Sequence, residues 1–490
     1  MNFTPTLTAL IVFTGVSPII SIISRRYGLR RLIEAYAVLA LAYTFYTALT
    51  QYGQITSTGP IREVAGDVAG VSSIIYVDLL SIYVALIFVA VGLLAAIFSI
   101  GYIEERRPEF YPLLLALVTG MVGVSFSGDL VTFFIFWEMM SIASYLLVAF
   151  RYRTWEAVEA SFKYLIMSAS GTAAILFGIS LMYGMAGTLE IEGLRMALAN
   201  SMAAGEVWSY VSIAFLVTGF GVNAAMVPFH SWLPDAHPAA PSSISAMLSG
   251  VVIKTGVYAM FRILTWVFPA PLFDWRVALA VFAVLTMTVG NLLALLQEDI
   301  KRLLAYSSIA HIGYIVFGLS IATASGIAGG LFHVLNHALI KALLFLGAGA
   351  LIHATNTRSI EELSGIGRRL PLVATCFAIG LFALAGIPGL NVFWSEFTIV
   401  TAGLAAGSIY TPLSIVMVVN ILISVAYYLR LVQAIFFKPL SEVASRAHGV
   451  GVSLAIPLIV LAAAGIVIGV YPTPFLELAT SVAASLAGSF

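Results

Sequence analysis

The sequence contains very little charge and almost no cysteine. Of its 490 residues, 9% are charged and 61% are hydrophobic, with a mean hydropathy of +1.04. This composition excludes an ordinary soluble domain and is typical of a polytopic membrane protein. The single cysteine, Cys376, cannot supply a disulfide, zinc or iron–sulfur ligand set, and no glycine-rich nucleotide loop follows a strand pattern. We therefore expect no cofactor or metal of its own and no nucleic-acid partner.

Long apolar runs make up most of the chain. A membrane-crossing helix needs about 20 apolar residues. About fourteen runs approach this length, near 6–23, 32–50, 78–101, 110–127, 129–150, 161–184, 209–228, 242–266, 275–296, 303–323, 325–352, 371–402, 410–437 and 452–471. No small-residue cleavage site follows the first run, so we interpret it as a helix rather than a removed signal. The predicted fold is an all-α polytopic membrane protein with about 14 transmembrane helices.

Basic residues are distributed unequally between the two sides of these spans. The odd-numbered connections hold sixteen Lys and Arg residues, Lys163 and Lys301 among them, whereas the even-numbered side holds four, including Arg262. Cytoplasmic loops carry an excess of Lys and Arg. We therefore place the odd connections in the cytoplasm and both termini on the extracytoplasmic side of the plasma membrane. The largest external loop is then 51–75.

Two of the predicted spans are interrupted by proline with glycine or polar residues beside it. They are 209–234 and 371–402, about 165 residues apart, and paired breaks of this kind indicate an internal repeat with a site at the breaks. A weak echo, SIASY at 141–145 and SIAHI at 308–312, has a similar offset. We predict two inverted five-helix repeats, helices 4–8 and 9–13, each with a broken helix. The predicted divisions are 1–108, 109–270, 271–437 and 438–490.

Six ionisable residues lie inside apolar runs, namely Glu138, Lys254, His311, His337, Lys341 and Glu396. A charged side chain at mid-membrane costs roughly 3 kcal/mol on insertion scales, and such residues usually face the protein interior. His333, His337 and Lys341 recur every four residues, so they form one helical stripe about 12 Å long. Imidazole titrates near physiological pH and passes a proton from one nitrogen to the other. These residues together indicate an internal path for protons or ions.

Structural interpretations of the same residues stay open. Glu138 fits a buried carboxyl that is hydrogen-bonded to a neighbouring helix, and Lys254 fits a side chain that snorkels to the headgroups. The His-x-x-x-His spacing can ligate a metal or haem, but no third ligand lies near it in the sequence. Asp78 and Asp129 each precede an apolar span, where a carboxylate caps a helix.

Several ordered segments carry a resemblance to a known family. They are FWEMMSIASYLL, PFHSWLPDAHPAAPSSISAMLSGVVIKTGVYAMFR, QEDIKRLLAYSSIAHIGY, FHVLNHALIKALLFL and AGIPGLNVFWSEF, and the match covers most of residues 75–435. The sequence resembles the antiporter-like membrane subunits shared by respiratory complex I, Mrp-type sodium/proton antiporters and archaeal membrane-bound hydrogenase-type complexes. The resemblance assigns ion translocation to five residues, Glu138, Lys254, His311, His337 and Glu396. Glutamate at 396 is similar to the M-type branch of complex I.

One position departs from the family pattern. The lysine of the family's helix 7, partner of the helix-5 glutamate, corresponds to Asn223, seven residues before His230. Asparagine cannot carry a proton charge, although it can hold a water, so the glutamate–lysine switch is incomplete. Either Glu138 pairs with another cation, such as Lys254 or one from an adjacent subunit, or this half-channel does not run the usual cycle.

The resemblance implies a proton-translocating or proton/sodium-coupled subunit of a multisubunit, redox-driven ion pump, with no catalytic centre of its own. Its implied partners are further antiporter-like and small membrane subunits, a cytoplasmic iron–sulfur redox arm and the lipid bilayer. Two alternatives remain. One is a subunit of an Mrp-type cation/proton antiporter without a redox partner, and the other is a structural subunit in which Asn223 impairs transport.

Overall fold

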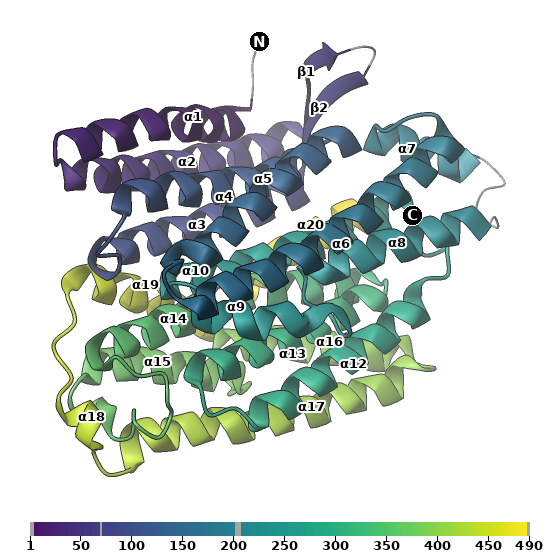
Figure 1. Ribbon diagram of the computed structural model, residues 1–490. Helices are drawn as coiled ribbons and strands as arrows, with labels where there is room; N and C mark the ends of the chain where they lie inside the picture. The colour runs from purple at the N-terminus through teal and green to yellow at the C-terminus, as the bar shows by residue number, and fades with distance from the viewer. Residues whose placement is uncertain (1–3, 69–70, 201–206, 488–490) are drawn as a thin grey trace.

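The structure is a bundle of long helices that run side by side. It is a computed structural model that describes residues 4–68, 71–200 and 207–487. A β-hairpin and the short helix α7 lie at one end of the bundle, and α18 lies at the opposite end (Figure 1). Within the described residues, twelve helical stretches are long and apolar enough to cross a membrane. The predicted all-α polytopic membrane fold is therefore confirmed.

The first part of the chain forms five long helices and the hairpin. These elements are α1 (Pro5–Arg26), α2 (Arg30–Thr58), β1 (Ile61–Val68), β2 (Val71–Val77), α3 (Leu79–Tyr102), α4 (Arg107–Phe126) and α5 (Leu130–Val148). As predicted, Asp78 and Asp129 accept backbone N–H groups and cap α3 and α5. The antiparallel pairing of β1 with β2 was not predicted, because 51–75 has the glycine and charge content of a loop.

The middle of the chain contains long helices interspersed with short ones. In order they are η1 (Ala149–Arg151), α6 (Trp155–Ala186), α7 (Ile191–Asn200), α8 (Val207–Asn223), η3 (Phe229–Trp232), α9 (Leu233–Ala239), α10 (Ser242–Met247), η4 (Leu248–Val252), α11 (Ile253–Arg262), η5 (Ile263–Val267), α12 (Arg276–Leu295), α13 (Ile300–Ser320) and α14 (Ala324–Thr355). The C-terminal elements are η6 (Ile366–Arg368), α15 (Pro371–Leu384), α16 (Asn391–Ala406), α17 (Tyr410–Val432), η7 (Gln433–Phe437), α18 (Glu442–Ser445), α19 (Val452–Val470) and α20 (Thr473–Ala487).

Both predicted helix breaks are present. α8 ends at Asn223 and the chain turns helical again at η3, while α15 ends at Leu384 and α16 begins at Asn391. Together with the twelve continuous spans, these two broken ones account for the fourteen predicted crossings. Each break lies in the fourth helix of a predicted repeat. The inverted relation of the repeats and the four chain divisions remain predictions.

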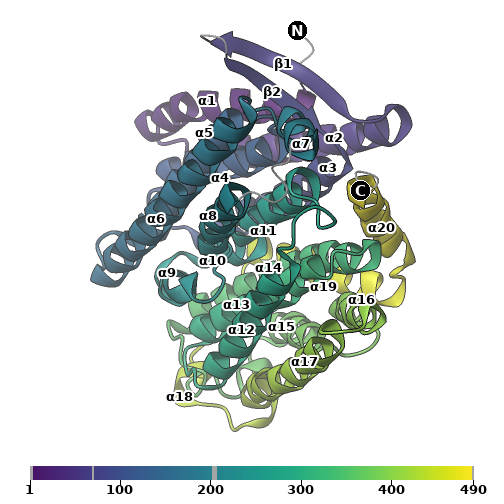
Figure 2. The same cartoon turned by 90° about the vertical axis from the view of Figure 1, so that its right-hand side faces the viewer.

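The most enclosed helices are those that carry the polar residues. Every residue of the most apolar window in 242–267 is buried, as are 94% of that window in α13, against 22% in α1. Viewed along the helices, α13 and α14 lie in the middle of the bundle, whereas α1 and α17 lie at its edge (Figure 2). The last helix, α20, packs against α14 and α3. A path of buried polar side chains would therefore run along these enclosed helices in the interior of the bundle.

Two cations that we counted as loop residues are buried instead. Lys301 is 2% exposed at the start of α13, and its Nζ donates to the carbonyl of Ala240 at 2.7 Å. Arg262 is 3% exposed in α11 and forms an ion pair with the Asp78 carboxylate, with two nitrogen–oxygen distances of 2.6 Å. Because both side chains are buried, neither residue indicates which side of the membrane its loop faces. One residue is removed from each of the two counts of basic loop residues, so the excess on the odd-numbered side stays. The orientation of the termini remains a prediction.

Candidate functional site

Three imidazole rings from two central helices are stacked together. His311 lies in α13, and His333 and His337 lie one turn apart in α14. The ring centroids are 5.2 Å apart for His311 and His333, 4.8 Å for His311 and His337, and 5.9 Å for His333 and His337. All three side chains are fully buried. The four-residue spacing in α14 thus presents both of its histidines to α13, as the stripe predicted.

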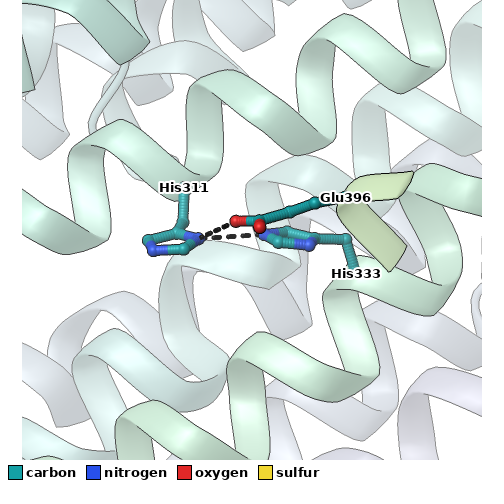
Figure 3. A group of neighbouring side chains, drawn as sticks. All are labelled: His311, His333 and Glu396. Atoms are coloured by element: carbon teal, nitrogen blue, oxygen red, sulfur yellow. Dashed lines mark hydrogen bonds and ion pairs between the residues drawn. The ribbon is translucent and has the colours of Figure 1, made fainter. Parts of the chain in front are cut away.

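Glu396 reaches this cluster because the second broken helix restarts inside the bundle. Its carboxylate Oε1 lies 3.9 Å from Nδ1 of His311, and that nitrogen lies 3.0 Å from Nε2 of His333 (Figure 3). The adjacent Ser395 hydroxyl lies 2.9 Å from the other ring nitrogen of His333. At the break, Gly386 has a φ of +70°, and a Cβ there would lie 2.8 Å from Oε2 of Glu396. Glycine therefore provides both the turn and the space for the carboxylate.

A chain of hydrogen bonds continues from the histidines to Lys341. Nε2 of His311 lies 3.1 Å from the Tyr428 hydroxyl in α17, and this hydroxyl is hydrogen-bonded to Ser307. The Lys341 ammonium donates to Oγ of Ser307 at 2.5 Å and to the carbonyl of Leu304 at 3.1 Å. Side chains from α16, α13, α17 and α14 therefore form one connected polar network in a buried region.

Lys254 approaches the same network from α11. It is 1% exposed, and its Nζ donates to the carbonyl of Ser249. Ser249 belongs to the π-helical turn η4, and such turns leave carbonyls free of their usual partners and often occur at functional sites. The Ser249 hydroxyl lies 2.6 Å from that of Ser308, which precedes His311 on α13 by one turn. Lys254 is buried beside α13 and does not snorkel.

Several buried polar atoms have no hydrogen-bond partner among the described residues. They include both ring nitrogens of His337, Oε1 of Glu396 and Nδ2 of Asn223. Buried polar groups in proteins are normally paired with protein or ordered water. These atoms therefore mark positions at which water molecules would complete the network.

Glu138 and Asn223 lie apart from the histidine cluster. Glu138 is half-buried in α5 and accepts a hydrogen bond from the Thr172 hydroxyl of α6 at 2.8 Å, which is the contact of the structural interpretation. In the described part of the chain it has no ion pair within 4 Å. Asn223 is 3% exposed at the end of α8, and its side-chain oxygen accepts the backbone N–H of Gly256, two residues from Lys254. The first break is thus joined to the Lys254 helix and not to Glu138.

Sequence reasoning missed several members of the buried polar set. Tyr428, Ser307 and Ser395 connect the histidines, but hydroxyls within apolar runs carry no signal of their own. His237 in α9 is fully buried, stacks on Phe345 at 4.3 Å and has no partner for either ring nitrogen among the described residues. Its segment, PFHSWLPDAH, already carries the family resemblance, so that motif could have indicated it.

Comparisons with known proteins agree with this architecture. The family described as NADH:quinone oxidoreductase/Mrp antiporter, TM, matches residues 127–424. F(420)H(2) dehydrogenase subunit N of Methanosarcina mazei is 35% identical over 84% of this chain and 85% of its own length. NADH-quinone oxidoreductase subunit N of Trichlorobacter lovleyi is 34% identical over 84% of this chain and 85% of its own.

Solved structures show the same fold over almost the whole chain. A chain of the membrane-bound sulfane sulfur reductase (MBS), an archaeal respiratory membrane complex, has a TM-score of 0.88 and 31% identity, covering 98% of this chain and 96% of its own. A chain of the Mrp complex from Dietzia sp. DQ12-45-1b has a TM-score of 0.88 and 26% identity, covering 99% of this chain and 98% of its own.

The two curated relatives named above are N subunits, so the similarity to the M-type branch that we drew from Glu396 finds no support in them. A single ionisable position is too little to assign a branch. The family itself is supported by the length of the match, the identity and the shared fold. This chain belongs to the family of antiporter-like membrane subunits of NADH:quinone oxidoreductases and Mrp antiporters, and it is a subunit of a multisubunit ion pump of that kind.

Proposed function

We propose that this chain moves protons through the buried network built by Lys254, His311, His333, His337, Lys341 and Glu396. The single observation that carries the proposal is the connected set of contacts from Glu396 through the histidines and Tyr428 to Lys341. Every ionisable member is at most 4% exposed. Buried ionisable groups inside a membrane are costly and by default mark an ion path.

The groups of this network are suited to pass a proton in steps. A proton enters one ring nitrogen of an imidazole and leaves from the other. Both ring nitrogens of His311 have such contacts, with His333 on Nδ1 and the Tyr428 hydroxyl on Nε2. The hydroxyls of Tyr428 and Ser307 each act as donor and acceptor, so they link His311 to the Lys341 ammonium.

Electrostatic coupling along the network is large enough to drive such steps. Unit charges 4 Å apart interact by about 4 kcal/mol at an effective dielectric near 20. The Glu396 carboxylate lies 3.9 Å from His311. A proton that arrives on either group therefore changes the proton affinity of the other by roughly three orders of magnitude. In this way a charge change in a neighbouring subunit is passed along the chain.

Neutral replacements of single charges test the proposal. We expect Glu396→Gln and Lys254→Met to abolish proton translocation by the intact complex in sealed vesicles, as measured with a pH-sensitive dye. Glu442→Gln and Lys438→Met remove the same charges at exposed positions and serve as matched controls. Unaltered translocation in both buried variants would contradict the proposal.

Glu138 is positioned for a different role, as a link to the next subunit. It lies half-buried on α5 between the exposed Ile135 and Ile142, and its only described side-chain bond is to a neutral hydroxyl. A cation from an adjacent antiporter-like subunit would complete an ion pair with Glu138.

We further propose that the complex lies in the plasma membrane with both termini outside. We also propose that an iron–sulfur redox arm energises it, because the curated relatives are named as subunits of dehydrogenases and quinone oxidoreductases. Copurification with iron–sulfur subunits tests the last point.

A second candidate is an ion-driven cation/proton antiporter, which the similarity to the Mrp complex favours. In that case the chain would copurify only with membrane subunits, and sodium gradients alone would drive proton movement in vesicles.

The structural alternative is favoured by Asn223, which occupies the end of α8 where the family has a lysine. If Asn223→Lys and Glu138→Gln both leave coupling unchanged, that alternative gains support.

A further inference from the structure

The atoms of the histidine cluster also form a potential metal site. One nitrogen each of His311 and His333 and one carboxylate oxygen of Glu396 all lie within 4.8 Å of one another, and all three residues are buried (Figure 3). The His-x-x-x-His spacing of His333 and His337 had no third ligand near it in the sequence, whereas the fold pairs His333 with His311 and brings Glu396 to both from a helix far along the chain. The fold supplies that ligand.

The separations fit a tetrahedral zinc-type ion. With metal–ligand bonds of about 2.0–2.1 Å, the ligand atoms of a tetrahedral site lie about 3.3 Å apart. The two distances around Nδ1 of His311 are 3.0 Å to His333 and 3.9 Å to Glu396, and they bracket this value. Two histidines and one glutamate with a fourth position open form a known donor set for zinc. The third separation, between the His333 nitrogen and the Glu396 oxygen, is at most 4.8 Å, so the carboxylate has to move toward both rings to close the site.

The second ring nitrogen of each histidine is already held by a suitable partner. Nε2 of His311 contacts the Tyr428 hydroxyl, and Nδ1 of His333 contacts the Ser395 hydroxyl. Because Ser395 donates its own proton to the carbonyl of Val392 at 2.8 Å, its oxygen accepts from His333. Such outer partners fix the orientation and tautomer of metal-bound histidines. Oε1 of Glu396 has no hydrogen-bond partner among the described residues, so it is free to bind.

We propose that His311, His333 and Glu396 bind a divalent transition-metal ion of the zinc class, and that the bound ion blocks the proton network. The ion binds the nitrogen and carboxylate lone pairs that would otherwise accept the translocated protons. Binding requires the proton between the two histidines to move from Nδ1 to Nε2 of His311, which then donates a hydrogen bond to the Tyr428 hydroxyl, and requires any proton on Glu396 to leave. The inhibitory half of this inference rests on the proposed function, whereas the binding half does not.

The donor set also predicts which ions are refused. Calcium prefers six to eight oxygen ligands and magnesium an octahedron of oxygens that includes several waters. The site offers a single carboxylate and two imidazoles, which suit zinc and cobalt. We assign the entry of the ion to the second break, where residues 387–389 are exposed and Gly386, which has no side chain, lies beside Oε2 of Glu396.

Cobalt provides a direct test with the intact complex, purified through a tag that contains no histidine. We expect Co²⁺ to give the visible absorption of a four-coordinate site and Zn²⁺, but not Mg²⁺, to remove it. His333→Gln and Glu396→Gln should weaken binding by more than the roughly 10–100-fold that loss of an outer-shell partner costs. His337→Gln is the matched control, because it removes an imidazole from the same stack but keeps all three ligands, and it should retain the band.

The outcomes separate this inference from the proposed function. An unchanged cobalt band in His333→Gln and Glu396→Gln, or no band in the unmodified complex, overturns the site even if Glu396→Gln stops proton translocation. A band that depends on both ligands, together with translocation that Zn²⁺ does not slow, keeps the site and overturns the blocking role. Glu396→Asp, which retains a carboxylate, should keep a weaker band and so distinguishes ligand loss from misfolding.

Discussion

The buried ion pair between Asp78 and Arg262 offers the sharpest test of what holds the helices together. The pair joins the start of α3 to α11 with two contacts of 2.6 Å, and both side chains are less than 10% exposed. Removing one partner of such a pair typically costs about 3–5 kcal/mol, because a buried charge is left alone. We predict this loss for Asp78→Asn. Asparagine still caps α3 through Ser81, so the cost reports the ion pair and not the cap.

Replacing both partners should recover most of the loss. In Asp78→Asn combined with Arg262→Met no charge is left buried, and apolar replacements of buried pairs are often neutral. Asp78→Ala should be about 1 kcal/mol worse than Asp78→Asn, since it also removes the cap. The free energy of unfolding is measured by SDS titration in mixed micelles, followed by circular dichroism, with Glu442→Gln at the exposed Arg446 pair as control.

Two results would refute this reasoning. One is an Asp78→Asn variant that unfolds within about 1 kcal/mol of the unmodified chain, far below the range for a buried pair. The other is a double variant no more stable than Asp78→Asn alone. Either would mean that water reaches Arg262 and satisfies its charge without the carboxylate.

Two further pairs of variants, each a test variant with its control, probe the path itself. Gly386→Ala and Gly389→Ala both place alanine at positive φ, so each should destabilise the chain by about 1–2 kcal/mol. Only the first meets the Glu396 carboxylate, so proton translocation in vesicles should fall for Gly386→Ala alone, and equal activities would contradict the placement of Glu396. Tyr428→Phe removes the hydroxyl between His311 and Ser307 and should slow translocation while leaving thermal stability near that of Tyr83→Phe, which loses a buried hydroxyl that donates to the carbonyl of Leu331 outside the path. Slowing by both variants to the same extent would argue for a packing effect.

Much of the site could be predicted from residue type and helical spacing. Lys254 and Glu396 are visible in the sequence because charged residues are rare in apolar runs, and the spacing of His333, His337 and Lys341 fixes one helical face. The breaks are visible because proline and glycine interrupt helices. Tyr428 and Ser395 could not be predicted, since hydroxyls are common in membrane helices and become part of a path only through their neighbours.

The count of basic loop residues shows the same limit of prediction from the sequence. Lys301 and Arg262 look like loop residues because they lie near the ends of apolar runs, yet both are buried. Arg262 is buried because Asp78, which precedes it by more than a hundred residues, arrives beside it in the fold. A pairing of that kind has no local pattern from which it could be predicted.

Composition and periodicity alone determined the membrane location, the helices, the two breaks and the charges that lie in the middle of apolar runs, because each follows from the cost of placing polar groups in an apolar medium and depends only on residues close together in the chain. The tertiary structure alone decided which charges meet. It brought Glu396 to His311 and His333, and it left Glu138 half-buried against Thr172 of α6, because contacts between helices depend on packing and not on local sequence. The tertiary structure also created the proposed metal site, because it brought the carboxylate of Glu396 from α16 to the histidines.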